Sequence, residues 1–220
     1  GEGLLVMPPV YPPFLNASEQ AGCRRVEVPL RRGRDRYEMD FADLERKAQD
    51  PTVKALLFCS PHNPVGRVWT KEELQEVGRI CKRCDVTVIS DEIHSDIIMP
   101  GFEHTTFALA APFCLENLIV CTAPSKTFNL AGMKNSILVL PEEAQREQFD
   151  AFQRKLGISE GSTLDYVAVT AAFLGGKEWL EMVLHAIFQN ACMLRETLSQ
   201  FPEVVVSPLE GTYLMWIDLA

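Results

Sequence analysis

The segment from Val53 to Ser90 decides the fold, and it contains VKALLFC (53–59), SPHNPVG (60–66), TKEELQEVGRICKRC (70–84) and VTVIS (86–90). The first and last of these are short, largely apolar runs, which are typical of strands in a sheet that is covered on both faces. Thr70 and Glu73 have the spacing of a capping box, and the apolar residues after them recur on one face of a helix. A strand, a helix and a second strand in this order predict a crossover between parallel strands.

The same alternation continues on both sides of this segment. Strand-like runs lie at residues 4–7, 25–30, 118–122 and 135–140, and helix-like stretches lie at 13–21, 40–49 and 142–156. The sequence contains no internal repeat and no low-complexity tract that would indicate another architecture. It therefore predicts an α/β fold with a doubly wound, mainly parallel sheet.

From residue 163 onward, long helices replace this alternation. A helix is expected at 163–174, and a longer amphipathic helix is expected at 177–201 after the Gly175-Gly176 break. Strand character returns at 204–206 and 212–217. The change in pattern indicates that a second structural unit begins near the long helix.

We therefore expect a large domain over residues 1–176, followed over 177–220 by an interdomain helix and the start of a smaller C-terminal α+β domain. The chain starts on Gly1 without an initiator Met and stops after an apolar run, so we expect a piece of a longer polypeptide. The apolar residues of the long helix are expected to pack in the interdomain core: Trp179, Met182, Phe188 and Met193.

Composition and charge exclude several classes of protein. The chain has 220 residues, of which 47% are hydrophobic and 23% charged, so it is neither disordered nor fibrous. Its 30 acidic and 21 basic residues give a net charge of −9, which disfavours nucleic acid as a partner. No stretch is long and apolar enough for a membrane span. Seven cysteines, mostly inside apolar runs, favour reduced thiols and a cytoplasmic location, and Cys81 and Cys84 are expected to be packed thiols rather than half of a zinc site.

Polar residues follow three of the expected strands, at the edge where open α/β sheets bind ligands. Taken singly, each is typical of a turn, a helix cap or a solvated charge. Together they place an amide, a carboxylate and an amine at one edge. A lysine at the end of a buried strand is partly desolvated, which lowers its pKa and leaves some free amine to form a Schiff base. The candidate residues are Asn63, Asp91, His94, Ser125, Lys126 and Lys134.

Four motifs in the chain occur in the order of a known family: VYPPF (10–14), SPHNPVGRVW (60–69), SDEIHSD (90–96) and APSKTFNLAG (123–132). With these motifs the chain resembles the fold-type I pyridoxal-phosphate enzymes of the aminotransferase class I/II family. The likeness is greatest to the PatB/MalY-like cystathionine β-lyase, or C–S lyase, branch. The resemblance implies pyridoxal 5′-phosphate as cofactor, a small amino-acid substrate and a homodimer.

The resemblance also implies a role for each matching residue. Lys126 would hold the cofactor as an internal aldimine, and Asp91 would pair with its pyridine nitrogen. Asn63 would donate a hydrogen bond to the phenolic oxygen, and Tyr11 would stack on the ring. Ser125 and Lys134 would hold the phosphate.

Two residues depart from the broader aminotransferase pattern and suit the lyase branch better. His94 stands where many relatives have tyrosine, and either contacts the ring oxygen or lies behind the residues that do. Lys134 stands where they have arginine, so it offers a point charge rather than a fork. In the family, further phosphate ligands precede the strand at Leu4, and the arginine for the substrate carboxylate lies beyond Ala220.

The resemblance implies β-elimination, in which Lys126 removes the Cα proton and a cysteine S-conjugate such as cystathionine yields a thiol, pyruvate and ammonia. Transamination is the first alternative, because it uses the same lysine and aspartate. The second alternative is a catalytically inactive partner chain or fragment that keeps the fold without binding the cofactor.

Overall fold

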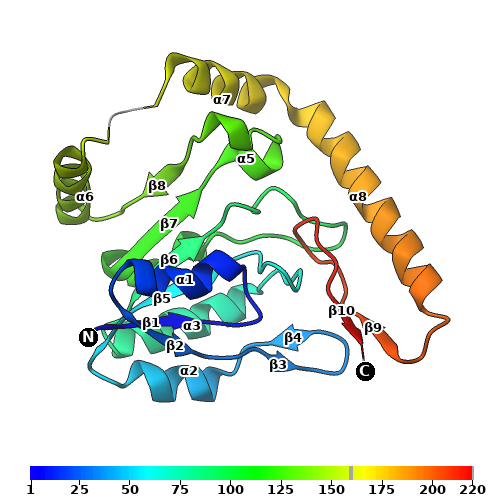
Figure 1. Ribbon diagram of the computed structural model, residues 1–220, viewed down its shortest axis with the longest axis horizontal. Coiled ribbons are helices and arrows are strands. Elements are labelled where there is room, and N and C mark those ends of the chain that lie inside the picture. Colours follow the sequence, from blue (N-terminus) through cyan, green and yellow to red (C-terminus); the bar gives the residue numbers. More distant parts are fainter. Residues whose placement is uncertain (159–160, 220) are drawn as a thin grey trace.

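The computed structural model of the protein describes residues 1–158 and 161–219, and its centre is a six-stranded sheet of order β2-β1-β5-β6-β7-β8 (Figure 1). Strands β2 to β7 in this order run parallel, whereas β8 pairs with β7 antiparallel. The prediction of a mainly parallel α/β sheet is therefore confirmed. The strands are β1 (Gly3–Val6), β2 (Arg24–Glu27), β5 (Val53–Cys59), β6 (Thr87–Asp91), β7 (Leu118–Thr122) and β8 (Ile137–Val139).

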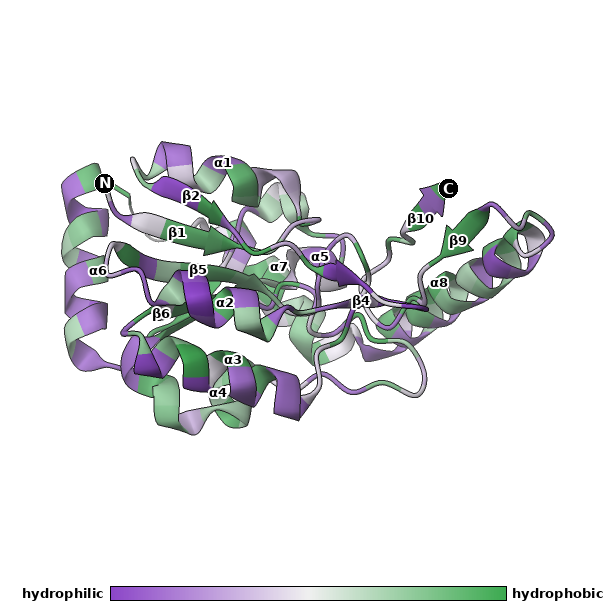
Figure 2. Cartoon of the chain, turned by 90° about the horizontal axis from the view of Figure 1, so that it is seen from below, coloured by the Kyte–Doolittle hydropathy of each residue, from purple (hydrophilic) through white to green (hydrophobic). Residues whose placement is uncertain are grey.

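Helices cover both faces of this sheet. Successive side chains of each strand point to opposite faces, so each face has its own apolar cluster. Leu56 and Phe58 of β5 belong to the main core with apolar residues of α2, α3 and α4, whereas Cys59 packs with Phe14 of α1 on the other face. In Figure 2, β1 and β5 are largely hydrophobic, while the helices mix hydrophilic and hydrophobic residues. The helices up to β7 are α1 (Pro12–Gln20), α2 (Phe41–Ala48), α3 (Lys71–Arg83), α4 (Phe107–Ala110) and the 3-10 helix η1 (Pro112–Asn117).

Helix α3 begins at the capping box that the sequence predicts. The Thr70 hydroxyl accepts the N–H of Glu73 at 3.2 Å, and the Glu73 carboxylate accepts the N–H of Thr70 at 2.8 Å. Gly78 lets this helix approach its neighbours, because a Cβ at this position would lie 2.9 Å from that of Ala111. The predicted apolar face of α3 is buried in the main core.

The C-terminal part of the chain contains the remaining helices and a separate antiparallel pair of strands. Strand β9 pairs with β10 there. These elements are α5 (Pro124–Thr127), η2 (Ala131–Met133), α6 (Glu143–Leu156), α7 (Thr163–Gly175), α8 (Lys177–Leu198), β9 (Val204–Val206) and β10 (Ile217–Leu219).

One local element was missed, and one local prediction was wrong. The hairpin of β3 (Arg31–Arg32) and β4 (Tyr37–Glu38) was not predicted, because two-residue strands leave no periodic pattern. The expected strand at 212–217 begins only at Ile217. Thr212 instead has a left-handed φ of 69° and donates its N–H to the carbonyl of Ile97, so the chain first turns back to the loop that follows β6.

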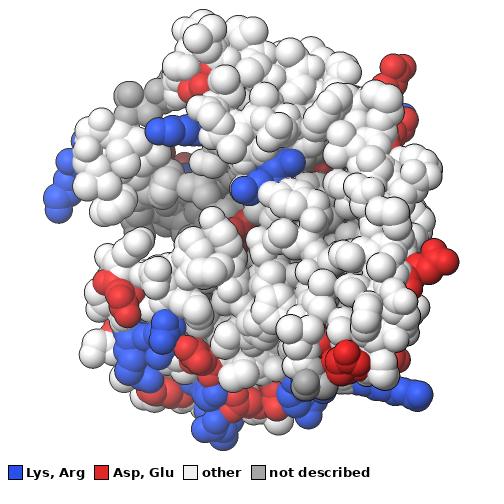
Figure 3. Space-filling model, turned by 45° about the vertical axis from the view of Figure 1, so that its right-hand side comes forward, with Lys and Arg blue, Asp and Glu red and all other residues white. Residues whose placement is uncertain are grey.

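Helix α8 carries exposed apolar side chains, and its expected place in an interdomain core stays a prediction. Trp179, Met182 and Met193 are 40%, 65% and 63% exposed, because α8 runs outside the helix layers of the main sheet (Figure 1). In the view of Figure 3, acidic and basic side chains gather along the lower edge of the molecule, and few charged side chains lie above that edge. Neither α8 nor another helix within the two described ranges has the length and apolar character needed to cross a membrane.

Replacing Leu74 by alanine tests the central role of the main core. Leu74 is fully buried, so Leu74→Ala is expected to lower the free energy of unfolding by about 2–5 kcal/mol in urea denaturation. Leu109→Ala is the matched control, because Leu109 is 74% exposed and its loss should cost less than about 1 kcal/mol. Equal losses in the two variants would contradict this assignment of the core.

Candidate active site at the carboxyl edge of the sheet

The candidate site is built on the ends of three adjacent parallel strands. Asp91, the last residue of β6, is in register with Cys59 at the end of β5 and with Cys121 near the end of β7. The N–H of Ser60 donates to the carbonyl of Asp91 at 2.9 Å, which continues the ladder beyond β5. Asn63 lies in the loop that follows β5, and Lys126 lies in the short helix that follows β7, so the sheet itself gathers these residues at one edge.

Tyr11 and Asn63 are joined through their backbones. The N–H of Tyr11 donates to the carbonyl of Asn63 at 2.9 Å, and the N–H of Asn63 donates to the thiol sulfur of Cys59 at 3.4 Å. Tyr11 is the N-cap residue of α1, and its side chain is 44% exposed. The backbones of Tyr11 and Asn63 therefore lie next to each other, and the Tyr11 side chain is exposed.

Lys126 and Ser125 lie on the short helix α5, after β7. The hydroxyl of Thr127 donates to the carboxylate of Asp96 at 2.9 Å and so ties α5 to the loop after β6. Together with Ile97, Tyr213 and apolar residues of α8, Ser125 and Lys126 line a cavity of about 300 Å³. The lysine thus borders a space with room for a small organic molecule.

Burial decides the protonation of the groups around Asp91. It raises the pKa of Asp91 above the ordinary range of a carboxyl group, although the N–H of Ile93 and the positive charge of Lys126 both lower it. Burial, and then the charge of Asp91, raise the pKa of Cys59 to about 12 and that of Cys121 to about 11. The two thiols beside Asp91 are therefore neutral near pH 7 and do not act as nucleophiles.

His94 is a buried, neutral imidazole. It is 2% exposed, and burial together with the charge of Lys126 lowers its pKa to about 4. Its ring packs edge-on against Tyr213, with 5.4 Å between the ring centroids. Among the residues that the structure describes, its Nδ1 atom has no hydrogen-bond partner, so a ligand bound at this edge could pair with it.

Lys134 does not line the cavity that Ser125 and Lys126 border. It is exposed and ends η2 in a left-handed conformation, with φ 48°. It lines a different cavity of about 970 Å³ together with Gln153 and Arg154 of α6. The structure thus brings Ser125 and Lys126 to one cavity and Lys134 to another, and the phosphate-binding role of Lys134 stays a prediction.

Sequence reasoning missed Glu92, which supports the site from behind Asp91. Its buried carboxylate accepts hydrogen bonds from the hydroxyl of Ser90 at 3.0 Å and the N–H of Phe107 at 2.8 Å, and lies 3.1 Å from Nε2 of His104. Although burial alone would raise the pKa of Glu92, its contact with His104 and the Phe107 hydrogen bond lower it. A charged residue directly after an apolar strand was the available signal, but its partners lie too far along the chain to be read from a pattern.

The arrangement offers an amine, a carboxylate, an amide donor and an aromatic face on one open edge. Such a set suits a planar aromatic ligand with an aldehyde for Lys126 and a basic ring nitrogen for Asp91. The unpaired Nδ1 of buried His94 is a further polar atom that such a ligand could satisfy. Within the described residues, no cluster of three His, Cys, Asp or Glu side chains could hold a metal ion.

Comparisons with known proteins find the same architecture elsewhere. The model of the family "Aminotransferase class I and II" matches residues 1–220. Cystathionine beta-lyase PatB of Bacillus subtilis is 37% identical over 221 residues, which cover 100% of this chain and 57% of the relative. Cystalysin from Treponema denticola, whose crystal structure contains pyridoxal 5′-phosphate, has a TM-score of 0.96 and 39% identity over 99% of this chain and 56% of its own. The PLP-bound C-S lyase from Staphylococcus hominis has a TM-score of 0.93 and 34% identity over 99% of this chain and 55% of its own.

The state of His94 can be measured by NMR titration of the cofactor-free protein with labelled histidine. The His94 signal should titrate with a midpoint of about 4, and Lys126→Met should move this midpoint upward, because it removes the positive charge that disfavours the imidazolium. Lys71→Met, at the exposed first residue of α3, should leave the midpoint unchanged. A midpoint near the ordinary 6.5 would contradict the buried placement of the ring.

Proposed function

With a match over residues 1–220, the chain belongs to the aminotransferase class I and II family, and we propose that it acts as a pyridoxal-phosphate-dependent C–S β-lyase. The observation that supports the proposal is the position of Asn63, Asp91 and Lys126 at or just beyond the carboxyl ends of three adjacent parallel strands. The proposed substrates are cystathionine and other cysteine S-conjugates, because two of the relatives are named as lyases of this kind. The chain spans just over half the length of these relatives.

The residues at the sheet edge fit pyridoxal phosphate. Lys126 would hold its aldehyde carbon, Asp91 its ring nitrogen and Asn63 its phenolic oxygen, with Tyr11 against the face of the ring. Ser125, which lines the same cavity as Lys126, would contact the phosphate. When bound, this cofactor supplies an electron sink for the negative charge that develops at the substrate Cα.

Lys126 and Asp91 would have different roles in the elimination reaction. Lys126, once its amine is free, takes the Cα proton of the substrate. Burial raises the pKa of Asp91, and a positively charged ring nitrogen beside the carboxylate would lower it again, so Asp91 would stay ionised. The C–S bond at Cβ breaks and the thiolate takes up a proton. Addition of water balances the reaction, so one S-conjugate gives one thiol, one pyruvate and one ammonia.

The domain division and assembly follow from the same proposal. Residues 1–176 would form the cofactor-binding large domain, and residues 177–220 would form the interdomain helix and the start of the smaller domain. A homodimer with a small amino acid as its substrate, located in the cytoplasm, completes the proposal.

Reductive trapping tests the role of Lys126. After addition of pyridoxal phosphate and borohydride, the peptide that contains Lys126 should gain the mass of a reduced phosphopyridoxyl group, because an imine at this amine becomes a stable secondary amine. Lys126→Ala should abolish this label and the absorbance of the protein-bound imine. Lys54→Ala, at an exposed position of β5, should keep both. A label that persists unchanged in Lys126→Ala would refute the assignment.

A product assay tests the reaction type in the native full-length polypeptide. Cystathionine should give homocysteine and pyruvate in equal amounts, and Asp91→Asn should slow this reaction by about 100-fold or more, because a charged partner of the ring nitrogen is lost. Amino transfer to a 2-oxo acid without release of a thiol would instead identify an aminotransferase.

A further inference from the structure

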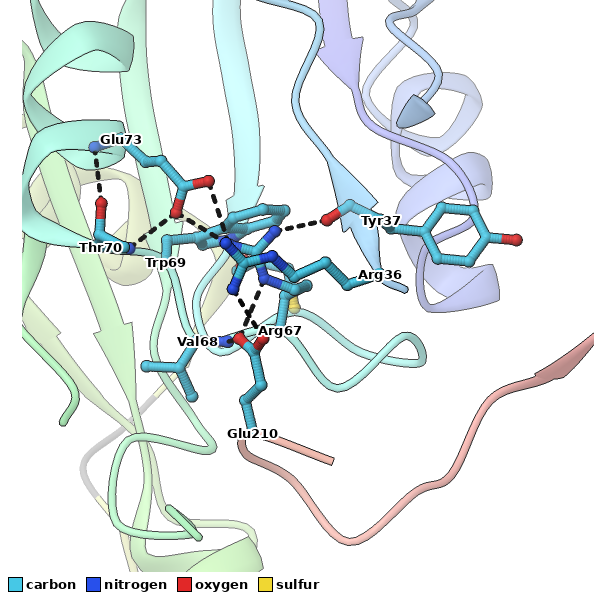
Figure 4. A network of polar contacts seen from close by, with 9 residues as sticks. Arg36, Tyr37, Arg67, Val68, Trp69, Thr70, Glu73 and Glu210 are labelled. Atoms are coloured by element: carbon cyan, nitrogen blue, oxygen red, sulfur yellow. Dashed lines mark hydrogen bonds and ion pairs between the residues drawn. The ribbon is translucent and has the colours of Figure 1, made fainter. Parts of the chain in front are cut away.

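An ion pair outside the proposed cofactor contacts joins two distant parts of the chain. Nε of Arg67 donates to the carboxylate of Glu210 at 2.9 Å across a sequence separation of 143 residues (Figure 4). The two side chains are 1% and 2% exposed. Burying both charges is costly unless every donor and acceptor is satisfied, so the surroundings of the pair decide what it can do.

Each nitrogen of the Arg67 guanidinium group donates a hydrogen bond. Nη2 donates to both carboxylate oxygens of Glu73 at 3.0 and 2.9 Å, and Nη1 donates to the backbone carbonyl of Tyr37. The group also lies 4.6 Å from the ring centroid of Trp69. The planar guanidinium group of arginine reaches all of these acceptors, whereas the single ammonium group of a lysine could not bind them together.

The carboxylate of Glu210 is equally well satisfied. Besides Arg67, it accepts the N–H of Val68 at 2.9 Å and a hydrogen bond from Arg36 at 3.3 Å. Glu210 is therefore held by two side chains and one backbone amide of the large domain. These contacts fix Glu210 against the large domain, although it lies in the segment between β9 and β10.

The backbone next to Glu210 bridges two loops of the proposed site. The N–H groups of Glu210 and Gly211 both donate to the carbonyl of Gly66 at 3.0 Å. On the other side, the N–H of Met99 donates to Glu210 at 2.9 Å, and the N–H of Thr212 donates to Ile97 at 2.8 Å. Residues 210–212 thus lie between the loop that carries Asn63 and the loop that carries His94.

The fit between this segment and the loops is close. A Cβ on Gly211 would lie 2.8 Å from a methyl carbon of Val68 and 3.2 Å from the carbonyl oxygen of Ile97, so a larger residue would push the loops apart. The turn that carries Asn63 is closed at its base, where the N–H of His62 donates to the carbonyl of Arg67 at 2.7 Å. Tyr213, directly after the segment, packs against His94.

We propose that Arg67 and Glu210 are positioning residues for the cofactor site. Their buried ion pair holds residues 210–212 between the two loops, and thereby sets where Asn63 and His94 lie relative to Asp91. This inference rests on the proposed function, because it concerns the same site. It also makes cofactor binding and docking of residues 210–212 mutually supportive, since coupling between two equilibria is reciprocal.

The test uses Glu210→Gln and Arg67→Lys in the native full-length polypeptide. Both variants should bind pyridoxal phosphate about tenfold more weakly in an absorbance titration, and the double variant should be little worse than either one, because the two residues act as a unit. Glu45→Gln is the matched control, because it breaks an exposed ion pair with Arg83 of 2.7 Å and should change nothing.

A second readout separates positioning from general destabilisation. A displaced Asn63 no longer withdraws charge from the ring oxygen, so the midpoint pH of the bound cofactor's absorbance change should rise by about one unit in Glu210→Gln. Loss of stability alone would not move this midpoint in the folded, loaded protein. A wild-type midpoint together with wild-type affinity in both variants would overturn the proposal.

Hydrogen exchange on the unmodified protein keeps the test decisive if the variants fail to fold. Loading with pyridoxal phosphate should slow exchange of the amides of Met99 and residues 210–212, and unchanged exchange on loading would refute the coupling. Failure of the wild-type protein to be labelled at Lys126 would overturn the proposed function together with this inference. A labelled wild type with unaffected variants would overturn the inference alone.

Discussion

The parallel pairing of β5, β6 and β7 is the constraint on which the rest of the structure depends. Because these strands are neighbours and run in the same direction, the loops that follow them leave from one edge of the sheet. The register places Asp91 between Cys59 and Cys121. A slip of one residue would turn Asp91 to the opposite face, because side chains alternate along a strand. The core packing that fixes this register therefore also fixes the site.

Burial at this edge, more than any single contact, decides which groups are charged. It favours the neutral forms of both Asp91 and His94, and so moves their pKa values in opposite directions. The ammonium group of Lys126 lowers the pKa of both, which favours an ionised Asp91 and a neutral His94. The single positive charge of Lys126 therefore acts in the same direction on both groups, and it favours a charged acid beside a neutral base.

The large sheet alone does not fix the loops at the carboxyl ends of β5 and β6. Residues 210–212, from the far end of the chain, supply hydrogen bonds to both loops, and the pair of Arg67 and Glu210 fixes that segment. A buried ion pair is weak support for stability, because desolvation offsets much of its attraction. Its value lies in geometry, since a guanidinium with several fixed acceptors tolerates only one arrangement of the chains around it.

The sequence by itself determined the sheet, the family and the set of polar residues after its strands. Strands 53–59 and 118–122 and the capping box at Thr70 were predicted as they occur, because apolar runs and cap spacing are local properties. Only the tertiary structure decided that Ser125 and Lys134 line different cavities, that residues 210–212 contact the loops after β5 and β6, and that Arg67 pairs with Glu210. The physical reason is that these features depend on which distant surfaces meet, and periodicity along the chain carries no record of that.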